Sequence, residues 1–193
     1  MMRKSLIFGS IGMIILTSNA SATLITFDDG QPNETAIGSF YSGQGVTFTD
    51  AKWTDNFGLP GTTGAQAVAS ISGGYNPPQD QPIGAMFAST MSSVTLRGID
   101  VGANGFRLKG FDASNTLVDN EVVFGTGDGT GEFFDLTVQG QIKRVEFSAD
   151  NLLAADGLIF DNLSYTAAPV PEPATLAALG SGLVVLLKKR RRK

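Results

Sequence analysis

Residues 105–124 read Gly-Phe-Arg-Leu-Lys-Gly-Phe-Asp-Ala-Ser-Asn-Thr-Leu-Val-Asp-Asn-Glu-Val-Val-Phe. Apolar and polar residues alternate on both sides of Asp112-Ala-Ser-Asn115, and a period of two is the pattern of a β-strand with one buried face. Asp, Ser and Asn favour turns because their short side chains bond the nearby backbone. The stretch therefore predicts a hairpin of two strands, Phe106–Phe111 and Leu117–Phe124.

Runs of the same kind continue in both directions from this hairpin. The further predicted strands are Leu24–Phe27, Val46–Thr49, Ala67–Ile71, Ile83–Phe87, Val94–Val101, Phe133–Val138, Ile142–Phe147 and Leu158–Tyr165. Gly, Asn, Asp and Pro separate the runs, and no long segment has the helical period, so we expect an all-β fold, a jelly-roll-like β-sandwich. The apolar positions change parity near Gly98 and Gly110, which predicts β-bulges there. Residues 50–82 are expected to be mostly loop.

Composition narrows the chemistry that this chain can perform. None of its 193 residues is cysteine or histidine, which excludes disulfides, thiol nucleophiles, Ser-His-Asp triads and histidine-ligated zinc. Residues 23–170 carry six basic and 17 acidic residues, a formal charge of −11. Such a domain repels nucleic acid, and catalysis in it would depend on carboxylates, lysine, tyrosine or a hard metal.

Residues 1–22 have the three parts of a secretory signal peptide. Arg3-Lys4 supply the positive charge, Leu6–Leu16 form a short apolar helix, and Ala20-Ser-Ala22 fits the small-x-small cleavage rule. The mature chain would then begin at Thr23, and residues 23–166 would form the β-sandwich domain. The alternative is an uncleaved anchor helix, for which the apolar run is short.

Residues 167–193 combine three features in a fixed order. Val170-Pro-Glu-Pro173 is followed by an apolar run that ends at Leu187 and by the basic cluster Lys188–Lys193. This order resembles the PEP-CTERM sorting signal. The resemblance implies a sorting motif formed by Val170, Pro171, Glu172 and Pro173, and a partner of the exosortase type, a membrane protease that would cleave near it. The alternative is an ordinary tail anchor with a proline-rich spacer.

The apolar run of this tail predicts a short transmembrane helix. Ala174–Leu187 would span about 21 Å as a helix, less than the ~30 Å hydrocarbon core, so lysine snorkelling and local thinning would have to absorb the mismatch. Lys188–Lys193 would keep the end of the tail cytoplasmic by the positive-inside rule. We expect export, a transient inner-membrane anchor and then the cell surface or the extracellular space, in a Gram-negative bacterium as the resemblance implies.

The middle of the chain resembles the galactose-binding-like jelly rolls of carbohydrate-binding modules. The similar stretches are Ile25–Asp29, Gly105–Ala113, Val145–Phe147 and Asp156–Tyr165. They are loose patterns that imply a fold and not a ligand. The resemblance also implies that a structural calcium is common in such domains.

Two carboxylates stand out because each interrupts an apolar row. Alternation places Asp161 on one face with Ile159 and Leu163, and Asp29 on one face with Ile25 and Phe27. A carboxylate in such a row is costly unless it is paired or liganded, and no basic residue is adjacent to either. If the terminal strands lie side by side, Asp29 and Asp161 could hold a structural Ca²⁺ with backbone carbonyls and water. The alternative is turn capping near Gly30.

Aromatic residues in the loop-rich segment suggest a sugar contact. Trp53, Phe57 and Tyr75 could stack on sugar rings if they are exposed, and they would otherwise cover the core. The sequence thus favours a non-enzymatic exported surface or matrix protein, sorted through its tail, with exopolysaccharide as a candidate ligand. The alternative is a secreted carbohydrate-active enzyme, a hydrolase or lyase that works through carboxylates.

Overall fold

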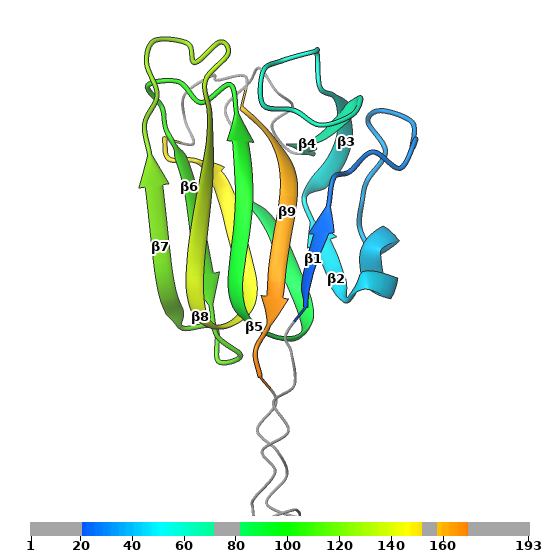
Figure 1. Ribbon diagram of the computed structural model, residues 1–193, viewed down its shortest axis with the longest axis vertical. Helices are drawn as coiled ribbons and strands as arrows, with labels where there is room; N and C mark the ends of the chain where they lie inside the picture. Colours follow the sequence, from blue (N-terminus) through cyan, green and yellow to red (C-terminus); the bar gives the residue numbers. More distant parts are fainter. Residues whose placement is uncertain (1–20, 72–81, 152–157, 170–193) are drawn as a thin grey trace, which may run out of the picture. The chain divides into compact units, whose positions relative to one another are not determined.

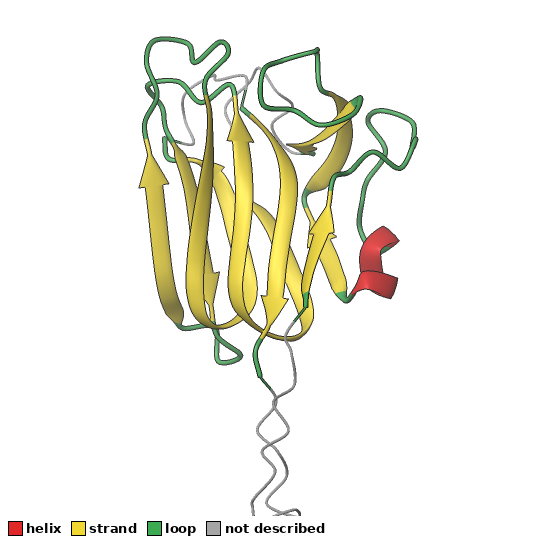
Figure 2. Cartoon of the chain, in the orientation of Figure 1, coloured by secondary structure: helices red, strands yellow, loops and turns green. Residues whose placement is uncertain are grey.

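The alternating sequence produces strands throughout residues 21–71, 82–151 and 158–169, which the computed structural model describes. Within these ranges the strands are β1 (Ala22–Ile25), β2 (Val46–Thr49), β3 (Ala51–Asp55), β4 (Gln66–Ser70), β5 (Ile83–Ile99), β6 (Phe106–Phe111), β7 (Leu117–Val123), β8 (Phe133–Ala149) and β9 (Ile159–Ala167). A short 3₁₀ helix, η1 (Phe40–Gln44), is the one helix of these ranges (Figure 2). The prediction of an all-β fold is confirmed.

All strand pairs are antiparallel and form one continuous sheet. The order is β3-β4-β9-β5-β8-β6-β7, β1 also pairs with β9, and β2 also pairs with β5 (Figure 1). The two terminal strands therefore lie side by side, as the calcium prediction required. Residues far apart in the sequence meet on β5, because it lies between β8 and β9.

This one sheet forms a sandwich because its two longest strands, β5 and β8, bend. β2 pairs with residues 84–87 of β5, whereas β9 pairs with residues 91–99 of the same strand. The β5–β8 register shifts between Met86 and Ser93, and Gly140 in β8 has a φ of 132°, which favours glycine. Figure 1 shows both strands curving back at the lower end, so each contributes one half to each layer.

The core lies between the two layers and is rich in phenylalanine. Its largest fully buried side chains include Phe27, Phe87, Phe106, Phe147 and Phe160. The rings of Phe147 and Phe160 lie 4.8 Å apart in a T-shaped pair, a geometry that aromatic rings prefer. The confirmed β-sandwich is thus stabilised by apolar burial from both layers.

Two departures from the predicted strands have physical causes. Ala51–Asp55 forms β3, although the segment was expected to be loop, because Ala51 to Thr54 are all buried and no alternation is visible. Gly98 keeps regular pairing with both neighbouring strands, so the bulge predicted there is wrong. Glycine is required at position 98 because a Cβ would lie 2.5 Å from the Phe106 ring. A register shift does occur between Gly110 and Phe111.

The parity change near Gly98 has a different origin from a bulge. Ile99 is buried on the opposite side of the sheet from Leu96, in a small second cluster with Ala67 and Ile159. Leu59, from the loop between β3 and β4, packs against this cluster. That loop therefore covers the upper end of β5 and β9 on the outside of the sandwich.

Several predictions fall on residues outside the described ranges. These are the signal helix, Tyr75, the sorting motif from Val170 to Pro173, and the transmembrane helix. Among the residues that are described, no helix has the length and apolar character needed to cross a membrane.

Candidate functional site

Asp161 lies on the outer face of the sheet, because β9 contains a bulge. Thr95 of β5 pairs with Ser164 and Arg97 pairs with Asp161, so β9 uses one residue more than β5 over this interval. Asn162 absorbs the extra residue with a φ of 52°. The prediction that Asp161 shares a face with Leu163 is therefore wrong, since an inserted residue reverses the alternation.

The buried Asp161 carboxylate holds the β3–β4 loop against the sheet. Its side chain is 0% exposed, and Oδ2 accepts hydrogen bonds from the Thr63 backbone N–H at 2.7 Å and the Thr63 hydroxyl at 3.0 Å. Oδ1 accepts one from the backbone N–H of Asn162 at 2.6 Å. Burial raises the pKa of Asp161, although these hydrogen bonds oppose the shift. These three hydrogen bonds, together with the charge of Arg97 opposite it on β5, compensate for the burial of the Asp161 carboxylate.

The same loop is held a second time by Asp28, next to β1. Asp28 Oδ1 accepts hydrogen bonds from the backbone N–H groups of Ala65 at 2.7 Å and Gln66 at 3.0 Å. Gly64 fits beside this carboxylate only because it has no side chain, since a Cβ would lie 2.0 Å from it. The β3–β4 loop is therefore fixed to both terminal strands by carboxylates.

Asp29 has a different partner from Asp161. Phe27 has a φ of 62°, which ends the extended backbone of β1, so the alternation predicted from Ile25 to Asp29 does not hold. Asp29 accepts a hydrogen bond from the Tyr41 hydroxyl. Burial, and then this hydrogen bond, raise the pKa of Tyr41. The Asp29 carboxylate therefore binds η1 through Tyr41.

A calcium site at Asp29 and Asp161 gains no support from this donor set. Calcium takes six to eight oxygen ligands, whereas these two carboxylates already accept hydrogen bonds from separate groups. Among the described residues there is no group of three or more acidic side chains that could hold a metal ion. Calcium binding by Asp29 and Asp161 stays a prediction of the sequence.

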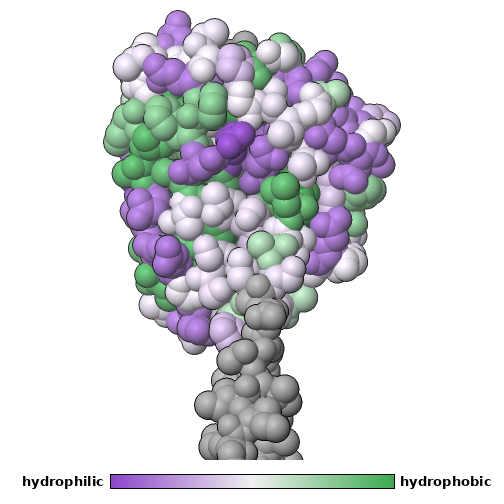
Figure 3. Space-filling model, viewed as in Figure 1, coloured by the Kyte–Doolittle hydropathy of each residue, from purple (hydrophilic) through white to green (hydrophobic). Residues whose placement is uncertain are grey.

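Next to the β3–β4 loop, the outer surface of β8, β5 and β9 is polar. We call it the polar face and define it by Thr95, Arg97, Asp135, Thr137 and Ser164. Their neighbours along the strands, such as Leu96 and Val138, are buried in the core, so these five point outward. Figure 1 shows the three strands side by side on the side turned to the viewer, and Figure 3 shows hydrophilic residues crossing that side.

An ion pair lies at the centre of the polar face. Arg97 Nε donates to Asp135 Oδ1 and Arg97 Nη2 donates to Oδ2, both at 2.8 Å, which is the bidentate geometry of a strong pair. Arg97 Nη1 donates to the carbonyl of Gly61 at 3.0 Å and so joins the pair to the β3–β4 loop. Beside it, the hydroxyls of Thr95 and Thr137 lie 2.8 Å apart. The polar groups are thus fixed in place before any ligand arrives.

Phe133 adds an apolar surface to this face. The residue is 44% exposed, and the Arg97 guanidinium carbon lies 5.2 Å from the centroid of its ring. The base of the ring packs on Gly61, where a Cβ would lie 2.4 Å from Phe133 Cγ. None of the site residues predicted from the sequence is Phe133, Arg97 or Asp135. The doubled aromatic Phe133-Phe134 was the available signal, since one of two successive strand residues must face outward.

The aromatic residues predicted from the sequence to contact sugar differ in their exposure. Trp53 is only 1% exposed and packs against Phe40 and Tyr41, so its predicted sugar contact is corrected to a core role. A ring of that size is buried because its apolar area stabilises the fold. Phe57 is 52% exposed at the β3–β4 loop, where a sugar could reach it. Tyr75 lies outside the described residues.

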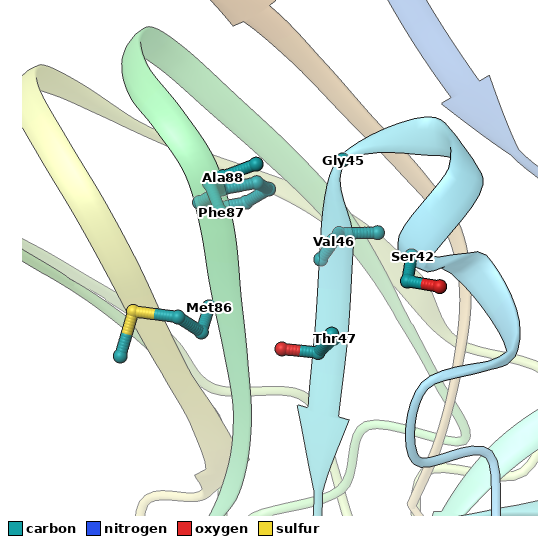
Figure 4. Close-up of a pocket in the computed structure, with 7 residues that line it drawn as sticks. All are labelled: Ser42, Gly45, Val46, Thr47, Met86, Phe87 and Ala88. Atoms are coloured by element: carbon teal, nitrogen blue, oxygen red, sulfur yellow. The ribbon is translucent and has the colours of Figure 1, made fainter.

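A hollow of about 170 Å³ lies on the other layer, beside η1 (Figure 4). Its lining consists of Ser42, Gly45, Val46, Thr47, Met86, Phe87 and Ala88. Ser42 and Thr47 supply the only side-chain hydroxyls among these seven residues. The hollow therefore lacks the convergent polar groups that orient a polar ligand, and the polar face is the better candidate site.

The end of the chain gives the clearest relation to known proteins. Residues 169–193 match the PEP-CTERM protein-sorting motif. The predicted resemblance is thereby confirmed, and the PEP-CTERM match includes all four residues of the predicted sorting motif, Val170 to Pro173. A PEP-CTERM motif implies a secreted or cell-surface protein. No curated protein matches the sequence.

Solved structures similar to this chain include two adhesin domains of Lys-gingipain (Kgp). The K2 domain is 14% identical with a TM-score of 0.48 over 76% of this chain and 99% of that chain. The K1 domain from Porphyromonas gingivalis W83 is 14% identical with a TM-score of 0.46 over 77% and 99%. A family 35 carbohydrate-binding module from Clostridium thermocellum is 14% identical with a TM-score of 0.40 over 77% and 100%. Similarity at this level assigns no ligand to this chain.

Proposed function

We propose that this chain is an exported, non-enzymatic surface or matrix protein that binds polysaccharide on its polar face and is sorted through its PEP-CTERM motif. The observation that carries the binding proposal is the half-exposed Phe133 ring beside the Arg97–Asp135 ion pair. A sugar ring has apolar C–H groups on its faces and hydroxyls at its edge. An exposed aromatic ring and fixed polar groups match these two features.

The layout of the polar face supports a chain-like ligand. The face is a sheet surface formed by β8, β5 and β9, and it carries the Thr95 and Thr137 hydroxyls at one side of the ion pair and Phe133 at the other. The β3–β4 loop forms one border of the face, and Asp161 and Asp28 hold that border in place. Exopolysaccharide is the proposed ligand class at the cell surface.

An enzymatic function has weaker support in the same region. A glycosidase needs two carboxyl groups beside the scissile bond, one of which has a raised pKa so that it can donate a proton. Burial raises the pKa of Asp161, but its side chain is 0% exposed beneath the β3–β4 loop and cannot reach a substrate. The alternative of a carboxylate-dependent hydrolase or lyase would show itself as new reducing ends in polysaccharide incubated with the protein.

The PEP-CTERM motif supports the sorting half of the proposal. An exosortase-type membrane protease would be the partner that processes the tail, and the apolar run would hold the chain in the inner membrane until then. The basic residues Lys188–Lys193 would act as the stop during export rather than as a nucleic-acid site.

Affinity electrophoresis tests the binding proposal. The purified chain migrates through native gels with and without soluble polysaccharide, and retardation relative to a non-binding reference protein gives the affinity. Phe133→Ala should weaken binding on the order of tenfold or more, as expected for the loss of a central aromatic anchor. Leu117→Ala, a half-exposed apolar residue of β7, is the matched control and should bind as wild type.

A third variant separates the two aromatic candidates. Phe57→Ala tests the sugar contact predicted from the sequence at the β3–β4 loop. If Phe57→Ala abolishes retardation and Phe133→Ala retains it, the site lies on the loop and the proposal for the polar face is wrong.

A further inference from the structure

We infer that the polysaccharide recognised by the polar face is neutral. This inference rests on the proposed function and goes beyond it by naming the ligand class. It starts from the charge of the domain: residues 23–170 hold 17 acidic side chains against six basic ones. A uronate-rich or otherwise anionic polymer would approach this domain against a repulsive potential.

The one cation of the polar face is already neutralised. All three nitrogens of the Arg97 guanidinium donate within the protein, two of them to Asp135 and one to the carbonyl of Gly61. A sugar carboxylate that approached the second N–H of Nη1 or Nη2 would lie close to the Asp135 carboxylate, whose like charge opposes its binding. The ion pair therefore excludes anions from the place where an arginine would otherwise attract them.

The groups that remain available suit hydroxyls. The Asp135 side chain is 47% exposed, and a carboxylate oxygen has lone pairs beyond the one that each Arg97 donor occupies. The Asp135 carboxylate can accept hydrogen bonds from sugar hydroxyls. An anionic sugar substituent has no hydrogen to donate to it. The Thr95 and Thr137 hydroxyls can both donate and accept, and the Phe133 ring presents only C–H and π surface.

Other arginines of the described domain lie away from this face and have acidic partners. Arg107 pairs with Asp150, and Arg144 pairs with Glu146 and lies 3.9 Å from the centroid of the Phe111 ring. Both arginines are on the outward side of the β6–β8 pairing, in the other layer of the sandwich. They therefore add no positive charge to the polar face.

Affinity electrophoresis with two kinds of gel tests the ligand class. The full chain is kept in a polyoxyethylene detergent, because a glycoside detergent would compete for the site. One set of gels contains neutral polymers, hydroxyethylcellulose and galactomannan, and the other contains polygalacturonate and alginate. Wild type should be retarded by at least one neutral polymer and by neither anionic polymer.

The same gels are then run with Asp135→Ala. Asp135→Asn, which preserves the shape of the side chain, is run as well in case the alanine variant folds poorly. Either variant removes the ion-pair partner of Arg97 and leaves the electrostatic attraction of the buried Asp161, so weak retardation by polygalacturonate should appear and should fall as salt is added. Wild-type retardation by an anionic polymer, or a folded Asp135 variant that gains no anionic binding, would overturn the inference. Retardation by none of the polymers would instead contradict the proposed function on which the inference rests.

Discussion

Replacing Asp161 with alanine removes the residue that fixes the β3–β4 loop to β9. In wild type the buried carboxylate accepts hydrogen bonds from two backbone N–H groups, those of Thr63 and Asn162, and from the Thr63 hydroxyl. The hydroxyl has a second acceptor in Asn162 Oδ1 at 3.1 Å, so it keeps a partner in the variant. The two N–H groups lose theirs.

The expected loss of stability follows from those two donors. A buried donor left without an acceptor costs about 1–3 kcal/mol, which gives a range of about 2–6 kcal/mol for the pair. Alanine also removes the cost of burying the carboxylate, the cause of the raised pKa of Asp161, so the net loss should lie near about 2–4 kcal/mol. For a domain of about 150 residues this corresponds to a melting temperature lower by roughly 4–16 °C.

Thermal unfolding followed by circular dichroism measures the loss of stability, and chymotrypsin measures the loop itself. The enzyme can cut after Phe57, a bond that the fixed loop should protect in wild type and expose in Asp161→Ala. Glu121→Ala, on the exposed edge strand β7, is the control and should change stability by no more than about 0.5 kcal/mol. A variant that melts within about 1 °C of wild type and keeps its loop protected would refute the argument that Asp161 anchors this loop.

Three further predictions concern pH, calcium and processing. Burial raises the pKa of Asp161, so the contribution of Asp161 to stability is largest at acidic pH and is lost as the pH rises through this raised pKa. The free energy of unfolding of wild type relative to that of Asp161→Asn should therefore increase from pH 7 to about pH 4. A difference that stays constant over this range would contradict the prediction. If Asp29 and Asp161 bind calcium, millimolar Ca²⁺ should raise the melting temperature of wild type but not of Asp161→Asn, and an unchanged wild type would exclude the site. Replacing Pro171-Glu-Pro173 by three alanines should leave full-length chain in the inner membrane of a host with the sorting enzyme, as judged by fractionation and C-terminal peptide mapping; equal processing of both forms would favour the plain tail anchor.

Strands that bury one face could be predicted from their alternation, and so could the fully buried β4, but β3, which buries both faces, could not. β2 and β6 have the predicted bounds, because their inward and outward residues differ clearly in polarity. β3 shows four buried residues in succession, and Lys52 within it is covered while its ammonium binds Glu34 at 2.6 Å. An alternation rule has no signal in such a segment.

The candidate site depended on long-range pairing that a single sequence does not encode locally. Arg97 and Asp135 face each other because β5 pairs with β8 in one register, and a shift by one residue would place them on opposite faces. The bulge at Asn162 likewise moved Asp161 from the core side to the loop side. The sequence therefore identified Asp161 as an unusual carboxylate, but it did not identify Thr63 and Asn162 as the hydrogen-bond donors to it.

Hydroxyl-radical footprinting of the full chain with and without a bound polysaccharide tests the central claim most directly, because the aromatic ring of Phe133 is both exposed and reactive. Binding on the polar face predicts that oxidation of Phe133 falls on addition of a retarding neutral polymer. Leu117 on β7 and Phe40 on η1 are also exposed. Their oxidation should be the same in the retarding polymer as in an equal concentration of a polymer that does not bind. Unchanged oxidation of Phe133, with protection at Phe40 or Leu117 instead, would contradict the account.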